Sequence, residues 1–209
     1  TSYRVGGLTW SPDGRFLATG SLNNTVRIWD VTTCQNKEID DALKAYTCSI
    51  LCVVWSPCGT FLASGSTNKT VCIWSFDPDT KQGKEVATFN GHIEGVNSVA
   101  WSPCGHYLAS GSDDETVRIW SFCTKTSQGK ELVVLEGHTH WVNSVAWSPC
   151  GQFLASGSWT TVRIWSVATS KEVLKFNQRT RVVTSVSWSP CGHFLASGSY
   201  DETVRIWSF

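Results

Sequence analysis

The sequence has no methionine and no excess of either charge. Its 209 residues include 17 basic and 17 acidic side chains, so the formal net charge is zero. A neutral chain gives no electrostatic reason to expect binding to nucleic acid or to an anionic membrane, both of which favour clustered lysine and arginine. Methionine is missing even at position 1. We therefore expect the chain to be part of a longer protein, so missing targeting signals carry little weight.

Charged residues and long apolar runs are also scarce. Charged side chains make up 16% of the chain, compared with roughly 25% in typical soluble domains. This scarcity indicates much buried surface per residue. No segment approaches the roughly 18 uninterrupted apolar residues of a membrane-spanning helix, and the first residues show no signal-peptide pattern. We expect no membrane association.

Cysteine is abundant, but its spacing fits neither a disulfide framework nor a metal site. None of the nine cysteines forms a C-x-x-C pair. Four of them occupy one position in a recurring W-S-P-C-G turn: Cys58, Cys104, Cys150 and Cys191. Equivalent turns on neighbouring units are expected to lie too far apart for the Cα separation of under ~7 Å that a disulfide needs. We interpret the cysteines as reduced thiols of an intracellular, cytoplasmic protein, with no bound metal.

Two short motifs recur five times along the chain. The pattern W-S-P-x-G begins at Trp10, Trp55, Trp101, Trp147 and Trp188. The pattern T-V-x-I-W ends at Trp29, Trp74, Trp120, Trp165 and Trp207. The first set is spaced by 45, 46, 46 and 41 residues, and periods of this size are typical of propellers or solenoids.

Each repeat predicts four short antiparallel strands. In the third copy, strands are expected over 96–102, 107–112 and 116–121, separated by turns at 103–105 and 113–115. A fourth strand is expected to begin at a Lys-Glu pair in four copies, at 37–38, 84–85, 130–131 and 171–172. Bulky residues on both faces of the third strand favour a blade that packs between two neighbours, as in a propeller.

These motifs, with L-A-S-G-S and the pairs Gly91-His92 and Gly137-His138, resemble the WD-repeat (WD40) β-propeller family. The resemblance covers essentially the whole chain. It implies an all-β propeller of four-stranded antiparallel blades with five WD repeats, roughly 1–44, 45–90, 91–136, 137–177 and 178–209. The last blade is expected to be incomplete, because nothing follows its third strand. A portion of a larger ring is favoured over a closed ring of five blades.

The family's structural tetrad can be placed residue by residue. In the third repeat the resemblance implies His92, Ser110, Asp114 and Trp120, with a packing role rather than a catalytic one. The fourth repeat keeps His138 and Trp165, but its turn is one residue shorter. The fifth has Arg179 where the histidine belongs, so we predict an Arg179–Asp201 ion pair. The first two repeats have no such histidine and carry Asn23 and Asn68 at the aspartate position.

Two tryptophans, Trp141 and Trp159, stand outside the repeat. Both fall in the loops that vary between copies, namely the loop that enters the first strand and the turn between the second and third strands. The resemblance implies that both loops open on one rim of the channel. Exposed aromatic residues near arginine are typical of binding hot spots. The candidate protein-binding residues are Trp141, Trp159, Tyr200, Arg181 and His140. The alternative is local packing, with Trp159 filling the space left by the shortened turn.

Three classes of function follow from the resemblance and the residues. The first is a non-catalytic protein-interaction scaffold within a larger intracellular assembly. The second is the ligand-recognition domain of a multidomain sensor, whose near-identical repeats vary at rim positions. The third, an enzyme, is disfavoured because no nucleophile–base pair, phosphate loop or metal spacing stands outside the repeat framework. We expect the protein to bind no cofactor and no nucleic acid. Its expected partners are other proteins in a multi-subunit complex.

Overall fold

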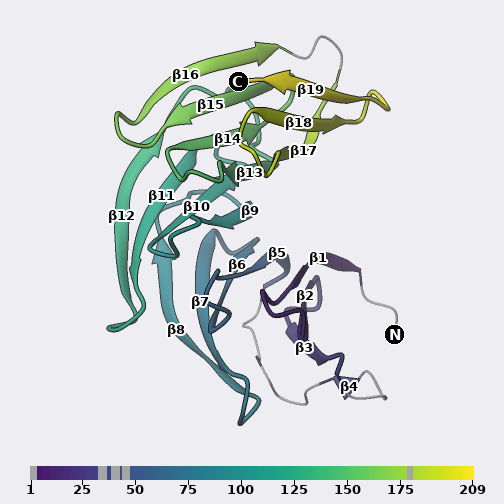
Figure 1. Cartoon of the computed structure of the whole chain (residues 1–209), viewed down its shortest axis with the longest axis vertical. Helices are drawn as coiled ribbons and strands as arrows, with labels where there is room; N and C mark the ends of the chain where they lie inside the picture. Colours follow the sequence, from purple (N-terminus) through teal and green to yellow (C-terminus); the bar gives the residue numbers. More distant parts are fainter. Residues whose placement is uncertain (1–3, 33–36, 39–42, 44–47, 178–180) are drawn as a thin grey trace.

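The structure, a computed structural model, describes residues 4–32, 37–38, 43, 48–177 and 181–209. Its strands form five antiparallel sheets in which each strand pairs with the next along the chain (Figure 1). The first sheet contains β1 (Val5–Trp10), β2 (Phe16–Ser21), β3 (Val26–Asp30) and the two-residue β4 (Lys37–Glu38). The second contains β5 (Ile50–Trp55), β6 (Phe61–Ser66), β7 (Thr70–Asp77) and β8 (Gln82–Asn90).

The remaining three sheets repeat this order. The third consists of β9 (Val96–Trp101), β10 (Tyr107–Ser112), β11 (Val117–Cys123) and β12 (Gln128–Leu135). The fourth consists of β13 (Ser144–Trp147), β14 (Phe153–Gly157), β15 (Thr161–Ser166) and β16 (Lys171–Asn177). The fifth has three strands, β17 (Val183–Trp188), β18 (Phe194–Ser199) and β19 (Val204–Ser208). The expected all-β blades and the incomplete last blade are thus confirmed.

The same joint holds each blade to the next. The valine and isoleucine of one blade's third strand lie under the first strand of the following blade. In the joint between the third and fourth blades, Val117 and Ile119 pack with Val142, Val145 and Trp147 in one buried cluster. Equivalent clusters join the first blade to the second, the second to the third and the fourth to the fifth. Burial of the apolar faces that neighbouring sheets turn toward each other is what stabilises the stack.

A glycine in the second strand allows this close approach. A Cβ atom on Gly111 would lie 2.6 Å from the Cγ1 atom of Val142, and one on Gly157 would lie 2.7 Å from that of Val183. Both distances are shorter than van der Waals contact, so a larger side chain here would push the blades apart. The glycine of L-A-S-G-S is therefore a packing requirement of the joint.

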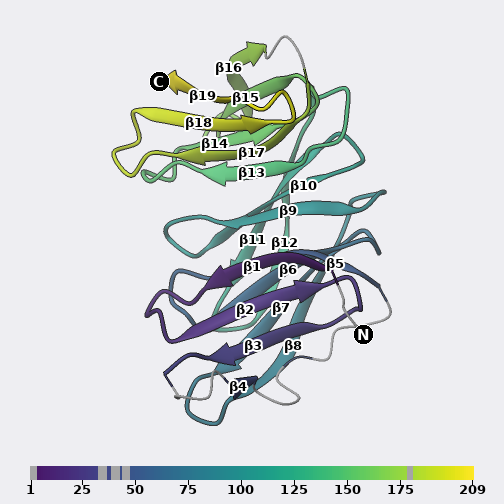
Figure 2. The same ribbon diagram turned by 90° about the vertical axis from the view of Figure 1, so that its right-hand side faces the viewer.

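The five blades follow an open arc, and Figures 1 and 2 show the two ends of the arc apart from each other. The outer face of the last blade is uncovered. Ile206 has 72% of its surface exposed, whereas its equivalent Ile119 has 1%. Leu8 and Trp10 are likewise exposed at the other end, although Trp55 and Trp101 at equivalent positions are buried.

The strand boundaries differ from the expected ones mainly at the fourth strands. The strands of the second and third blades begin at Gln82 and Gln128 rather than at the Lys-Glu pairs. The cause is that the third strands continue past their tryptophans, so that Asp77 pairs with Gln82 and Cys123 pairs with Gln128 in longer hairpins. In the fourth blade the last strand does begin at Lys171.

A matched pair of substitutions tests the joint. Ile119→Ala should lower the free energy of unfolding by about 2–5 kcal/mol, because it leaves a cavity between two blades. Ile206→Ala should change it by less than about 0.5 kcal/mol, because that side chain is exposed and packs against no further blade. Urea unfolding followed by circular dichroism measures both, and equal losses would contradict this description of the arc.

Candidate functional site

The loops that vary between repeats lie together at one end of the blades and are tied to each other by backbone hydrogen bonds. Within a blade, the turn binds the entering loop: the amide of Asp113 donates to the carbonyl of Gly95 at 2.9 Å. Between blades, the entering loop binds the preceding turn: the amide of Val142 donates to the carbonyl of Ser112 at 2.9 Å. The Val183 amide and the Ser158 carbonyl repeat this contact at 3.0 Å. These bonds make the rim a connected surface rather than a set of free loops.

The third blade has a buried polar chain beneath this rim. The Trp120 indole N–H donates to Ser110 Oγ at 2.8 Å, and His92 Nε2 lies 2.7 Å from the same hydroxyl. On the other side of the imidazole ring, His92 Nδ1 lies 2.8 Å from Asp114 Oδ2. The Ile93 amide also donates to that carboxylate oxygen at 3.0 Å. These hydrogen bonds hold the entering loop, the turn and two strands to one another.

The electrostatics of Asp114 fit such a role. Burial opposes ionisation of this carboxyl, but hydrogen bonds from His92 and Thr116 outweigh it and hold the pKa of Asp114 well below its ordinary value. Histidine, serine and aspartate could suggest a catalytic triad. Here the Ser110 hydroxyl is fully buried and engaged by both His92 and Trp120, so it is not available to a substrate.

The fourth blade has the same series of buried polar contacts but without a carboxylate. His138 Nε2 lies 2.7 Å from Ser156 Oγ, which accepts the Trp165 indole N–H at 2.8 Å. His138 Nδ1 meets the hydroxyl of Thr161 at 3.1 Å instead of an aspartate. Burial, with a smaller effect of Arg163 and Lys175, lowers the pKa of His138 to about 3. The imidazole is therefore neutral in the folded protein at neutral pH.

The other blades have fewer of these buried polar contacts. The third-strand tryptophan donates to a second-strand hydroxyl in the first, second and fifth blades, through Trp29–Thr19, Trp74–Ser64 and Trp207–Ser197. In the fifth blade, Asp201 Oδ2 lies 3.4 Å from Arg205 Nη2. The ion pair predicted between Arg179 and Asp201 involves a residue outside the described part of the chain.

Trp141 and Trp159 lie on the surface of the rim. Trp141 has 58% of its surface exposed and Trp159 has 47%, whereas framework tryptophans such as Trp120 and Trp165 are buried. Local packing therefore leaves about half of each indole in contact with solvent. The exposed parts of the two indole rings are accessible to a partner.

The shortened turn of the fourth blade positions Trp159. The amide of Ser158 donates to the carbonyl of Thr161 at 3.0 Å, so Trp159 and Thr160 alone form the tip. Ser158 Oγ donates to the carbonyl of His140 at 2.8 Å, which brings the tip against the entering loop. The imidazole of His140 then stacks on the indole of Trp159, with ring centres 5.3 Å apart and planes inclined by 30°.

Tyr200 and Arg181 lie on the corresponding loops of the fifth blade, and both are exposed. The Tyr200 amide donates to the carbonyl of Val182, and Ser199 Oγ donates to the carbonyl of Arg181. Among the described residues of the candidate set, the ring contact joins His140 and Trp159, and no ring or cation–π contact joins Arg181 or Tyr200 to either tryptophan.

Ile93 belongs to the same rim but is absent from the candidate set. It follows His92 in the entering loop of the third blade and is strongly exposed. The signal in the sequence is an apolar residue next to the tetrad histidine, in a loop that otherwise holds Glu94 and Gly95. The loops that carry Ile93 and Trp141 belong to adjacent blades, the third and the fourth.

In the described part of the chain, no three His, Cys, Asp or Glu side chains come together in a way that would hold a metal ion. The same residues include no helix with the length and apolar character needed to cross a membrane.

The family model described as WD domain, G-beta repeat matches the chain five times, at residues 1–30, 38–75, 83–121, 129–166 and 170–208. No curated protein matches the chain.

The neutral His138 predicts an acid-sensitive blade. The pKa of His138 is lower in the folded protein than in the unfolded chain, where it is about 6.5. Below pH 6.5 the unfolded chain therefore binds a proton at His138, whereas the folded protein does not. His138 therefore adds stability above that pH, and this stability is lost as the pH falls. At pH 5 the loss should be about 2 kcal/mol.

Urea unfolding at pH 7 and pH 5 measures this loss, with His138→Gln as the variant that cannot titrate. The difference between the two pH values should be smaller in the variant by about that amount. The same pH dependence in both proteins would show that other groups are responsible.

Proposed function

Because the chain belongs to the WD40 repeat family of β-propellers, we propose that it is a non-catalytic protein-interaction scaffold whose partner binds the rim of the fourth and fifth blades. The proposed contact residues are Trp141, Trp159, Tyr200, Arg181 and His140. The observation behind the proposal is that both tryptophans outside the repeat are about half exposed on this rim, while the framework tryptophans of the second, third and fourth blades are buried.

Physical chemistry favours aromatic residues in this setting. Tryptophan and tyrosine bring a large apolar area with few rotatable bonds, so ordering them on binding costs little. The exposed part of each indole still has hydrophobic free energy to gain when a partner covers it. The hydrogen bonds from Ser158 to His140 and from Val183 to Ser158 hold the loops in place before binding. Such preorganisation reduces the entropic cost of association.

The partners that fit this surface are other proteins, in a multi-subunit assembly of the cytoplasm. Members of this family usually lack catalytic activity, and the buried Ser110–His92–Asp114 chain supports the same interpretation. We also propose that the five blades, residues 1–209, form part of a larger ring. The support is the uncovered apolar face at each end of the arc, including a hollow of about 450 Å³ lined by Trp188, Phe194 and Ile206 among others.

A second candidate function is the recognition domain of a multidomain sensor. The supporting observation is the contrast between framework and rim. Residues 101–112 and 188–199 are almost identical, whereas the first turn residue is Asp113 in the third blade, Trp159 in the fourth and Tyr200 in the fifth. Such a pattern would allow the ligand to change while the fold is kept.

A capture experiment tests the rim. The immobilised wild-type chain and the Trp141→Ala/Trp159→Ala variant are exposed to lysate, and bound proteins are quantified by mass spectrometry. At least one specific partner should fall about tenfold or more in the variant, because truncating a hot-spot residue costs 2 kcal/mol or more.

The matched control is Leu132→Ala/Val173→Ala, which removes two exposed apolar side chains from the outer strands β12 and β16. It should retain the partner, and circular dichroism should show all three proteins folded. Retention of every partner by the tryptophan variant would place the binding surface elsewhere, and an equal loss in the control would show nonspecific adhesion.

A further inference from the structure

The turn between the first and second strands of each blade lies at the opposite end of the second strand from the aromatic rim. In every copy a serine after the tryptophan accepts the amide N–H of the aromatic residue that opens the second strand, as in Phe61 to Ser56 at 3.1 Å and Phe153 to Ser148 at 3.0 Å. The same hydroxyl lies within hydrogen-bond distance of the third residue of the turn, which is aspartate in the first blade and cysteine in the other four. Its proton can donate to a negatively charged group at this position.

The first blade shows what this position stabilises. Asp13 Oδ1 accepts the Ser11 hydroxyl at 2.5 Å and the Arg15 amide at 3.0 Å. These hydrogen bonds, that from Ser11 being the largest, lower the pKa of Asp13 below its ordinary value. The turn therefore supplies donors that favour a negative charge at this position.

Thiols occupy the same position in the other blades. The Cys58, Cys104, Cys150 and Cys191 sulfurs lie 3.2, 3.3, 3.3 and 3.2 Å from the hydroxyls of Ser56, Ser102, Ser148 and Ser189. Cys58 also meets the Thr60 hydroxyl at 3.1 Å. All four cysteines are exposed. Once such a cysteine is ionised, only the hydroxyl can donate, so the thiolate gains a hydrogen bond. These cysteines therefore meet both requirements for reaction as a thiolate, which are access and stabilised negative charge.

The titration behaviour of Cys58, Cys150 and Cys191 agrees with their geometry. Hydrogen bonds from Ser148 and Ser189, followed by backbone amides, lower the pKa values of Cys150 and Cys191. For Cys58, burial opposes ionisation, but the hydroxyls of Ser56 and Thr60 outweigh it and lower the pKa. By contrast, burial raises the pKa of Cys52 to about 12.

We propose that the four cysteines of the W-S-P-C-G turns are a row of nucleophilic modification sites, which react as thiolates with hydroperoxides and other small electrophiles. They form a row because consecutive turns meet: a Cβ atom on Gly59, Gly105, Gly151 or Gly192 would lie within 3.8 Å of the Cδ atom of the preceding blade's turn proline. The row is independent of the aromatic rim, since the two lie at opposite ends of the second strands.

The reaction with a hydroperoxide needs no further group of the protein. The thiolate sulfur attacks the distal peroxide oxygen, the S–O bond forms and the O–O bond breaks. The leaving alkoxide or hydroxide takes a proton from water. The sulfur is oxidised by two electrons to a sulfenic acid, and the peroxide is reduced to an alcohol or water. The serine hydroxyl stabilises the thiolate before the attack.

Peptide-resolved alkylation tests the proposal on the whole chain. Iodoacetamide at pH 7 is applied to the folded protein and to the same protein in urea, and mass spectrometry gives a rate for each cysteine. Cys58, Cys150 and Cys191 should react at least about threefold faster in the folded chain, because thiolate is the reacting form. Cys52, which is partly buried and whose pKa is raised to about 12, should react at least about tenfold more slowly in the folded chain than in urea. Folded-state rates at or below the urea rates for all three turn thiols would overturn the proposal.

Two variants distinguish the effect of the serine hydroxyl on the alkylation rate from the effect of exposure alone. In Ser148→Ala, Cys150 should slow to its rate in urea while Cys191 keeps the wild-type rate, and an unchanged Cys150 rate would refute the role of the hydroxyl. Asp13→Cys keeps every serine and places a thiol in the first-blade turn, so the test survives if the serine variant does not fold. In the folded protein the new thiol should react as fast as Cys150. If it reacts no faster in the folded protein than in urea, the turn is not the cause of the increased reactivity.

Hydrogen peroxide followed by dimedone, which labels sulfenic acids, tests the oxidation step on the wild-type chain. Label should appear on the turn cysteines and not on Cys52. Absence of label from all four turn cysteines would overturn the hydroperoxide part of the proposal.

Discussion

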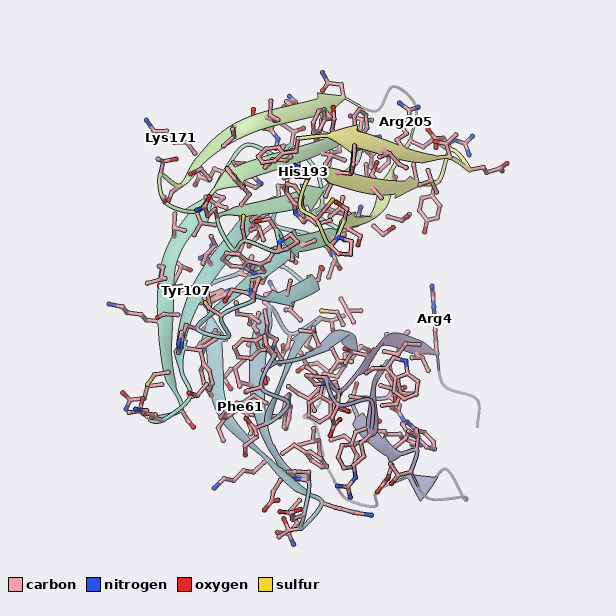
Figure 3. The ribbon with its side chains drawn as sticks, viewed as in Figure 1. Arg4, Phe61, Tyr107, Lys171, His193 and Arg205 are labelled. Atoms are coloured by element: carbon pink, nitrogen blue, oxygen red, sulfur yellow. The ribbon has the colours of Figure 1, made fainter. Side chains whose placement is uncertain are left out.

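The joint between consecutive blades is the interaction on which the rest of the structure depends. The valine and isoleucine of a third strand are buried only because the next blade covers them, as Val142 of the entering loop and Val145 of the first strand cover Val117 and Ile119. A single blade would leave both of its apolar faces in water, so no blade is stable without neighbours. The same requirement explains the glycine in the second strand of each of the first four blades, where the joint leaves no room for a Cβ atom. Figure 3 shows side chains between successive sheets of the arc.

Much of the fold could be predicted from the sequence because the joint repeats. The five copies of W-S-P-x-G and T-V-x-I-W place fifteen strands and their turns, and the structure has them. The start of the fourth strands was less predictable. Those of the second and third blades depend on how far a hairpin continues past the tryptophan, through pairs such as Asp77 with Gln82. Polar sequence at a hairpin end does not determine that extension, because both paired and unpaired polar residues are compatible with solvent.

The candidate site could be located from the sequence but not assembled from it. Trp141 and Trp159 are visible as departures from the repeat. Trp159 lies in a two-residue tip, which Ser158 ties to the entering loop through the carbonyl of His140, and the imidazole of His140 stacks on Trp159. These contacts join residues of separate loops, so the sequence alone does not place them together. Beneath the rim, His92 and His138 both lie near a threonine hydroxyl through Nδ1, but only His92 also has an aspartate there, Asp114. The shortened turn that exposes Trp159 is also what deprives His138 of an aspartate.

The central claim is that the repeat tryptophans of the second, third and fourth blades belong to the packed framework, whereas Trp141 and Trp159, which stand outside the repeat, are exposed and available to a partner. The most direct test compares the free energies of unfolding of Trp120→Ala and Trp159→Ala in urea. Trp120 is buried and donates to Ser110, so its removal should cost about 3–5 kcal/mol. Removal of Trp159 should cost less than about 1 kcal/mol, because it loses only a partly exposed stack. A loss at Trp159 as large as that at Trp120 would show that the rim tryptophan belongs to the core and would contradict the claim.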